Sequence, residues 1–330
     1  MSKAKLLTYG IGTLFSVLYG LACQYSIRNK ENAAGDFIAV MSVGFIFIFP
    51  FALGFSSVFF ATDEEKKSIA YKVLAPMISS ILSLFISMLV GWEGTICLIM
   101  ALPIYVVLAI VGGFIAGLLS NITSKSEIRM ISLAFVLLSP FIVTESENYF
   151  ELPSEVRTVN TQIEMNASAE TVWKKIIRIP EIKETQTGFF YKMGFPKPVE
   201  ATLDKEGVGG VRIAKFEKGL LFVETITRWE DKKLLTFKIK SDPSSTPLTT
   251  LDPHVVVGGR YFDTLLGEYE IETISDKKVI LHLFSKYRLS TRFNFYAAWW
   301  GDYLMEDIQN NILNVLKERA ENEERRLSNN

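Results

Sequence analysis

The sequence predicts an all-α transmembrane bundle of four or five helices, followed by a water-soluble α+β domain. Long uncharged runs fill residues 1–144, which hold only nine of the 35 Lys and Arg residues and seven of the 36 Asp and Glu residues. From residue 157 onward, apolar and polar residues alternate, and the chain closes on a long amphipathic stretch. The first pattern is typical of membrane spans, and the second of strands packed against a helix.

Four uncharged runs reach the ~20 residues that a helix needs to cross a bilayer. They are Leu6–Ile27, Phe37–Thr62, Val73–Trp92 and Gly94–Ser124. A fifth run, Met130–Thr144, has only 15 uncharged residues and contains Pro140, so it is either a span or a re-entrant or interfacial piece. The first run is too long for the apolar core of a cleavable signal peptide, so we expect it to remain in the mature protein.

Lys and Arg residues in the short loops predict the orientation, because cytoplasmic loops carry an excess of them. One side would hold Lys3, Lys5, Lys66, Lys67, Lys72, Lys125 and Arg129, and the other Arg28, Lys30 and Arg157. This imbalance favours a cytoplasmic N-terminus. The soluble domain then lies outside the cytoplasm with five spans and inside it with four.

The composition argues against several classes of function. No Asp, Glu, Lys, Arg or His lies within a candidate span, which argues against ion-coupled transport. The net charge of −1 argues against a nucleic-acid partner. Cys23 and Cys97 lie in apolar runs and the chain has only two His residues, so we expect no metal site and no cofactor. Gly112, Gly113 and Gly117 offer small surfaces for helix contacts within the bundle or between copies of the chain.

An acidic linker at 146–156 separates the bundle from the soluble domain, which we place at 157–321 with a polar tail at 322–330. Residues 159–165 alternate as a strand does. Asn166–Ser168 can cap a helix that Pro180 ends, and a second short helix is expected at 181–186. Six further strands are expected at 199–203, 211–217, 220–229, 234–240, 261–274 and 279–289, and a long helix at Ser290–Glu321. Gly207, Gly209 and Gly210 lie between strands, so they do not form a phosphate-binding loop.

This order of elements resembles the START-like or SRPBCC superfamily, which includes polyketide cyclases and the Bet v 1 allergens. The resemblance covers residues 155–320 and is carried by the segments 159–173, 207–212 and 224–237 and by the closing helix. It implies a helix-grip fold, in which a curled antiparallel sheet of about seven strands surrounds the last helix. It also implies a cavity for a lipid, sterol, polyketide or other apolar molecule. The N-terminal bundle is similar to a bacterial branch anchored in the plasma (inner) membrane.

The candidate site residues come from the faces that the strands and the closing helix would turn inward. Alternation along the strand 261–274 places Tyr261 and Asp263 toward the interior, where they can act as acid/base groups or orient a ligand head group. The alternative is that Asp263 caps the loop before it. Arg212 and Glu224 face inward on neighbouring strands and can pair. His254 lies in the long loop 241–259, which is a candidate lid, whereas His282 lies on the outer face of its strand. On the closing helix, Trp299, Trp300 and Tyr303 either line the cavity or fill the core.

Three functions remain open from the sequence. The leading hypothesis is a membrane-anchored domain that binds a lipid or other apolar small molecule, with the bilayer as its other partner. The second is a cyclase, dehydratase or hydrolase that uses Asp263, Glu224 or His254 as acid or base. The third is a sensor or protein-interaction module without catalysis. Between these classes a binding protein is favoured over an enzyme, since no Ser-His-Asp or Cys-His motif is present.

Overall fold

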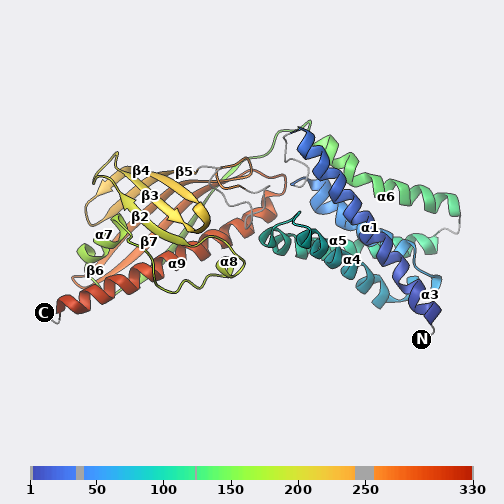
Figure 1. Ribbon diagram of the computed structural model, residues 1–330, viewed down its shortest axis with the longest axis horizontal. Helices are drawn as coiled ribbons and strands as arrows, with labels where there is room; N and C mark the ends of the chain where they lie inside the picture. Colours follow the sequence, from blue (N-terminus) through green and yellow to red (C-terminus); the bar gives the residue numbers. More distant parts are fainter. Residues whose placement is uncertain (1–2, 35–40, 123–124, 242–255, 329–330) are drawn as a thin grey trace. The chain divides into compact units, whose positions relative to one another are not determined.

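The computed structural model describes residues 3–34, 41–122, 125–241 and 256–328. The chain divides into two compact units, Met1–Leu152 and Pro153–Asn330. Figure 1 labels the helices and strands of both units.

All the regular secondary structure described in the first unit is helical. Its elements are α1 (Lys3–Ala34), the π-helix η1 (Gly44–Ile48), α2 (Phe49–Phe59), α3 (Asp63–Lys67), α4 (Ile69–Leu89), α5 (Thr95–Ile122) and α6 (Ser126–Glu147). Three of these, α4, α5 and α6, are long and apolar enough to cross a membrane. The run Phe37–Thr62, expected as a full span, contributes a shorter apolar helix over Gly44–Phe59. The fifth candidate run, in contrast, is the middle of the continuous 22-residue helix α6.

Small residues bring the helices of this unit into close contact, as the sequence predicted for Gly112 and Gly113. A Cβ atom on Gly112 would overlap the Phe51 carbonyl oxygen on α2, and one on Gly113 would lie 2.6 Å from the Pro76 ring on α4. Gly54 on α2 likewise packs against the backbone of Ala109 on α5. Because a side chain at any of these positions would push two helices apart, the glycines position α5 against both α2 and α4.

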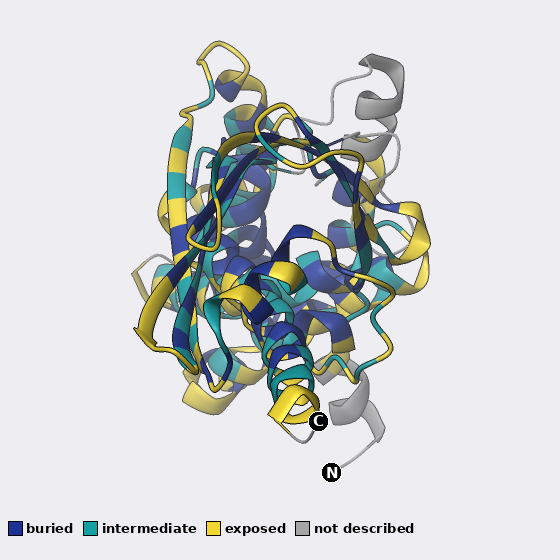
Figure 2. Cartoon of the chain, turned by 90° about the vertical axis from the view of Figure 1, so that its left-hand side faces the viewer, coloured by how far each residue is buried: buried dark blue, intermediate teal, exposed yellow. Residues whose placement is uncertain are grey.

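The second unit is a seven-stranded antiparallel sheet that curls around one long helix. Its strands are β1 (Glu155–Met165), β2 (Pro198–Leu203), β3 (Val211–Phe216), β4 (Leu221–Glu230), β5 (Leu234–Ser241), β6 (Phe262–Ser275) and β7 (Lys278–Leu289), in the order β1-β7-β6-β5-β4-β3-β2. Two short helices, α7 (Ala169–Ile177) and α8 (Phe189–Lys192), connect β1 to β2, and α9 (Asn294–Ser328) closes the chain. In Figure 2, which looks along α9, the sheet arches over the helix and buried residues lie on the faces that meet. This confirms the curled sheet and closing helix that the resemblance implied.

The second short helix differs from the prediction, since it lies at Phe189–Lys192 and not at 181–186. Ile179 exchanges both backbone hydrogen bonds with Ala201 of β2, and the Ile182 N–H donates to the Val199 carbonyl at 2.7 Å. The backbone of 179–182 is therefore paired with the edge of the sheet and is extended.

The closing helix continues to Ser328, through most of the stretch expected as a polar tail. Its last turns contact the start of α7. The Glu321 carboxylate accepts from the Asn166 N–H at 2.9 Å, and the Glu324 carboxylate accepts from the Thr171 hydroxyl at 2.8 Å. These contacts explain the ordered end of the helix, because carboxylates are favourable beside a helix N-terminus.

Candidate functional site

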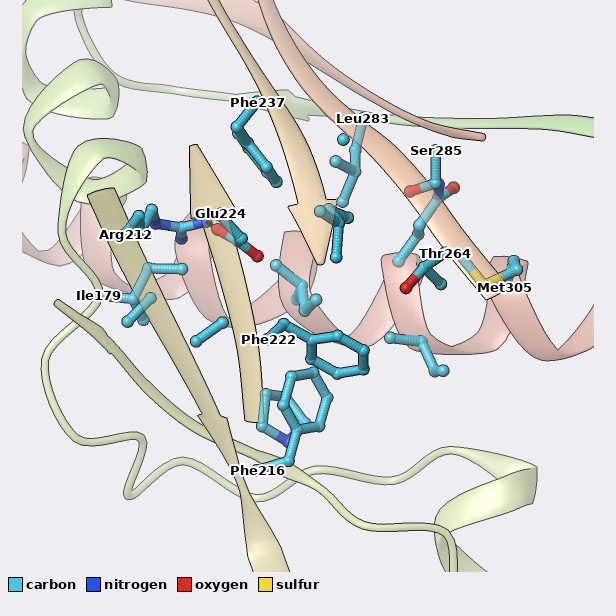
Figure 3. Close-up of a pocket in the computed structure, with 18 of the residues that line it drawn as sticks. Ile179, Arg212, Phe216, Phe222, Glu224, Phe237, Thr264, Leu283, Ser285 and Met305 are labelled. Carbon is cyan, nitrogen blue, oxygen red and sulfur yellow. Dashed lines mark hydrogen bonds and ion pairs between the residues drawn. The ribbon is translucent and has the colours of Figure 1, made fainter. Parts of the chain in front are cut away.

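A cavity of about 120 Å³ lies between the inner face of the sheet and α9. Its wall is mostly apolar. Side chains from the sheet and its connections include Ile179, Phe195, Ala201, Ala214, Phe216, Phe222, Phe237, Ile239, Phe262 and Leu283, and those from α9 are Leu304, Met305, Ile308, Gln309 and Ile312. Figure 3 shows part of this wall. The main polar groups in the wall are Arg212, Glu224, Thr264, Tyr269, Ser285 and Gln309.

Arg212 and Glu224 reach the cavity because of the alternation and register of β3 and β4. Arg212 and Ala214 are the buried positions of β3, and Phe222, Glu224 and Ile226 those of β4. The two charged residues are direct cross-strand partners in the sheet. Directly opposed side chains on one face of an antiparallel pair lie close enough to interact, so the register alone brings them together. The sequence-based pairing of these two residues is therefore what the structure shows.

The two side chains form a buried ion pair, drawn in Figure 3. Arg212 Nη1 lies 2.5 Å from Glu224 Oε2, and the side chains are only 3% and 8% exposed. The guanidinium also lies over two aromatic rings, 5.3 Å from the centre of Phe237 and 6.0 Å from that of Tyr269. Its buried Nε–H has no hydrogen-bond partner among the described residues. An unsatisfied donor of this kind is costly in a protein interior.

Burial perturbs the acid of this pair. It raises the pKa of the Glu224 carboxyl, and the neighbouring Arg212 opposes that shift. The guanidinium keeps its charge, because an arginine is not deprotonated in proteins. Burial likewise raises the pKa of the nearby Tyr269 phenol. The cavity thus holds a permanent cation whose counter-charge is a carboxylate that takes up a proton more readily than usual.

A second polar point lies on the helix side of the cavity and was not predicted. The Gln309 amide nitrogen donates to Ser285 Oγ at 2.8 Å, and its amide oxygen accepts from Thr161 Oγ1 at 2.9 Å. Gln309 is only 1% exposed, and its neighbours Leu304, Met305 and Ile308 are apolar wall residues. An amide one turn after Met305, on the apolar face of the helix, is the signal that could have identified it.

The prediction that Asp263 faces the interior is wrong. Phe262 and Thr264 line the cavity at the start of β6, whereas Gly267 and Tyr269 line it farther along. The inward face changes from even to odd positions because the register of β6 shifts at a bulge between Thr264 and Leu266. Asp263 lies on the opposite face, across from Arg288 of β7, and burial raises its pKa.

The other candidates do not gather at the cavity. Tyr261 is 4% exposed but does not line the cavity. On α9, Trp300 is 7% exposed and belongs to the core, while Trp299 and Tyr303 are 62% and 41% exposed. The expectation that these two line the cavity or fill the core is therefore wrong, because the inward stripe of α9 is the one that carries Met305 and Gln309. His254 lies outside the described residues, as does most of the candidate lid 241–259.

The second histidine, His282, lies on the outer face of the sheet. Its Nε2 is 3.0 Å from Glu272 Oε2, and its ring stacks on Phe284. Across the described ranges of the chain, no cluster of three or more His, Cys, Asp or Glu residues could hold a metal ion.

Comparison with known proteins identifies solved structures of low sequence identity. No family model matches the sequence, and no curated protein matches it. Among solved structures, the protein XoxI from Bacillus cereus is 17% identical (TM-score 0.31), over 49% of this chain and 94% of its own. The Zhui aromatase/cyclase from Streptomyces sp. R1128 is 15% identical (TM-score 0.33), over 51% and 94%. Norcoclaurine synthase from Thalictrum flavum is 10% identical (TM-score 0.29), over 50% and 88%.

Proposed function

We propose that this protein is a membrane-anchored binding protein, whose second unit holds an apolar small molecule between the sheet and α9. The observation that carries the proposal is the apolar cavity, with the unpartnered Nε–H of Arg212 buried at its wall. Apolar enclosure with a few placed polar groups is typical of small-molecule sites. The first group of the ligand to be recognised is an acceptor oxygen, such as a carboxylate or carbonyl.

The size of the cavity limits what fits without rearrangement. An apolar protein cavity of ~150 Å³ is known to hold one benzene molecule, and this cavity is about 120 Å³. The enclosed part of the ligand is therefore one small ring or a short acyl segment. A longer lipid requires wall side chains to move, and the unbranched Met305 is the wall residue best able to do so.

The acid/base alternative has less support than binding. Asp263 lies on the face away from the cavity, which leaves Glu224 as the acidic wall residue that combines a raised pKa with access to a bound molecule. Glu224 is held by Arg212, so its first role is to balance the buried cation. A general acid or base must also lie within hydrogen-bond reach of the substrate atom that gains or loses the proton.

The binding proposal is tested with octanoate and 1-octanol, two short-chain probes that differ in the head group. Each is titrated by calorimetry into the full chain in nanodiscs, with empty nanodiscs as the blank. We expect octanoate to bind more tightly than octanol, because Arg212 makes a stronger hydrogen bond to an ionised carboxylate than to a hydroxyl. Ala214→Leu fills the cavity and abolishes binding of both, whereas Lys215→Leu, on the outer face of the same strand, leaves binding unchanged. Equal binding by both variants would refute the site.

The anchoring half of the proposal is supported by the three helices long and apolar enough to cross a membrane. The Lys and Arg distribution favours a cytoplasmic N-terminus, and five crossings then place the second unit outside the cytoplasm. Reporter enzymes that are active on only one side of the membrane, fused after Asn330, test this orientation. Activity of a cytoplasmic reporter would refute the five-span arrangement.

A further inference from the structure

An exposed stripe of aromatic residues runs along the first turns of α9. Phe295, Trp299 and Tyr303 recur at intervals of four residues and are 77%, 62% and 41% exposed. We name these three residues the aromatic stripe. The other exposed large apolar residues in the described part of the second unit are all aliphatic: Val156, Val208, Leu221, Val223, Ile274 and Leu327. A contiguous exposed aromatic surface on one helix face is typical of an interaction site.

The aromatic stripe begins where the chain enters the second unit. The Asn294 side-chain amide donates to the Pro153 carbonyl at 3.4 Å, and Ser290 Oγ lies 3.2 Å from Ser154 Oγ. Phe295 directly follows Asn294. The first residues of the unit and the start of the stripe are therefore fixed to each other by hydrogen bonds.

The segment that connects Pro153 to α6 is short. Helix α6 ends at Glu147, and Asn148–Leu152 follows it. Even fully extended, five residues span at most ~18 Å. The headgroup layers together add ~10–15 Å to the ~30 Å apolar core of a bilayer, so a domain tethered this closely stays beside the membrane surface. Tyr149 in this segment is itself 86% exposed.

We propose that the aromatic stripe inserts into the interfacial layer of the bilayer that α6 crosses. Trp and Tyr favour this layer because each combines an apolar ring with a polar atom. The proposal rests on the anchoring half of the proposed function and is independent of the cavity's ligand. It has a consequence for that ligand, since Leu304 and Met305 directly follow Tyr303 on α9 and line the cavity. An apolar molecule leaving the bilayer along the stripe would meet the cavity wall within one turn of the helix.

Fluorescence quenching by two nitroxide lipids tests the insertion. One carries its nitroxide near the headgroup, and the other carries it deep on the acyl chain. The full chain, with Cys23→Ala and Cys97→Ala, carries one labelled cysteine and is reconstituted into nanodiscs. Trp299→Cys reports on the stripe, and Leu138→Cys, on an exposed position of α6, reports on anchoring. The matched control is Ile274→Cys. Ile274 is also exposed, but it lies near the end of β6, whereas the start of that strand pairs with Leu289, a few residues before the stripe.

We expect the acyl-chain nitroxide to remove most of the emission at position 138 and the headgroup nitroxide to remove most of the emission at position 299, with position 274 unchanged in both lipids. Quenching at 138 without quenching at 299 overturns the insertion of the stripe while leaving the anchor intact. No quenching at 138 overturns the anchoring, and the insertion with it. Equal quenching at 299 and 274 also overturns the proposal, because the contact would then not be specific to the stripe.

Discussion

Removing the cation of the buried ion pair should destabilise the second unit strongly and in a pH-dependent manner. In Arg212→Met, the Glu224 carboxylate loses the ion pair with Arg212 in a site where its side chain is 8% exposed. Breaking a buried pair on one side costs about 3–5 kcal/mol. The carboxyl can avoid this cost by taking up a proton, which costs ~1.4 kcal/mol for each pH unit above its unfolded pKa of ~4.3. Protonation therefore limits the cost of leaving Glu224 without its partner to ~3.7 kcal/mol at pH 7 and ~1.6 kcal/mol at pH 5.5.

The sign of the pH dependence follows from the direction of the pKa shift. Burial raises the pKa of Glu224 in the folded protein, and loss of Arg212 removes the effect that opposes this rise. The folded variant therefore holds a proton that the unfolded chain releases, so its free energy of unfolding falls as the pH rises above the unfolded pKa. The wild type should show a weaker slope, since Arg212 stabilises the carboxylate.

Urea titration of the full chain in nanodiscs, followed by tryptophan emission, measures these changes. Trp173 is buried against Trp229 with ring centres 5.0 Å apart, so its environment changes on unfolding. The matched control is Lys215→Met, which breaks the half-exposed pair with Glu200 and should cost at most ~1 kcal/mol. A loss in Arg212→Met no larger than the control's, or one that does not change between pH 5.5 and 8, would refute the reasoning.

Two further changes test the packing of α9 by the same titration. Gly301→Ala places a Cβ 2.7 Å from the Tyr287 hydroxyl, and the overpacking cost of about 1–3 kcal/mol should outweigh a helix gain of about 1 kcal/mol. Gln309→Ala leaves the Ser285 hydroxyl without its amide donor and should cost about 1–3 kcal/mol. Asn310→Ala, at an exposed position, is the control for both variants. If it lowers the free energy of unfolding as much as Gly301→Ala or Gln309→Ala does, the packing roles given to Gly301 and Gln309 are wrong.

The sequence predicted the sheet well because its alternation is nearly continuous. All seven strands lie within a few residues of their expected positions, and the cross-strand pairing of Arg212 with Glu224 follows from that alternation. The face of Asp263 could not be obtained in this way. Leu265 and Leu266 are both apolar, so the pattern is compatible with either face, and the bulge that decides between them leaves no mark in the sequence.

The errors on the helices have a different origin. Trp299 and Trp300 are adjacent on the helix, so only one of them can face the sheet. Because both are tryptophans, the residue type does not show which one. The curvature of the sheet selects the stripe through Met305 and Gln309, which depends on contacts distant in sequence. The extended segment at 179–182 is likewise set by its pairing with β2, a partner about 20 residues away that overrides local helix propensity.

Stability alone does not explain why the wall of the cavity carries an ion pair. Replacing a buried pair with apolar residues of similar volume is often neutral or stabilising, so Arg212→Met/Glu224→Leu should recover most of the stability lost in Arg212→Met. The same double variant removes the unpartnered Nε–H of Arg212 at the cavity wall. If the pair serves a ligand, this variant should unfold like the wild type and bind octanoate no better than octanol. A double variant that still prefers octanoate would show that the pair has no part in recognition.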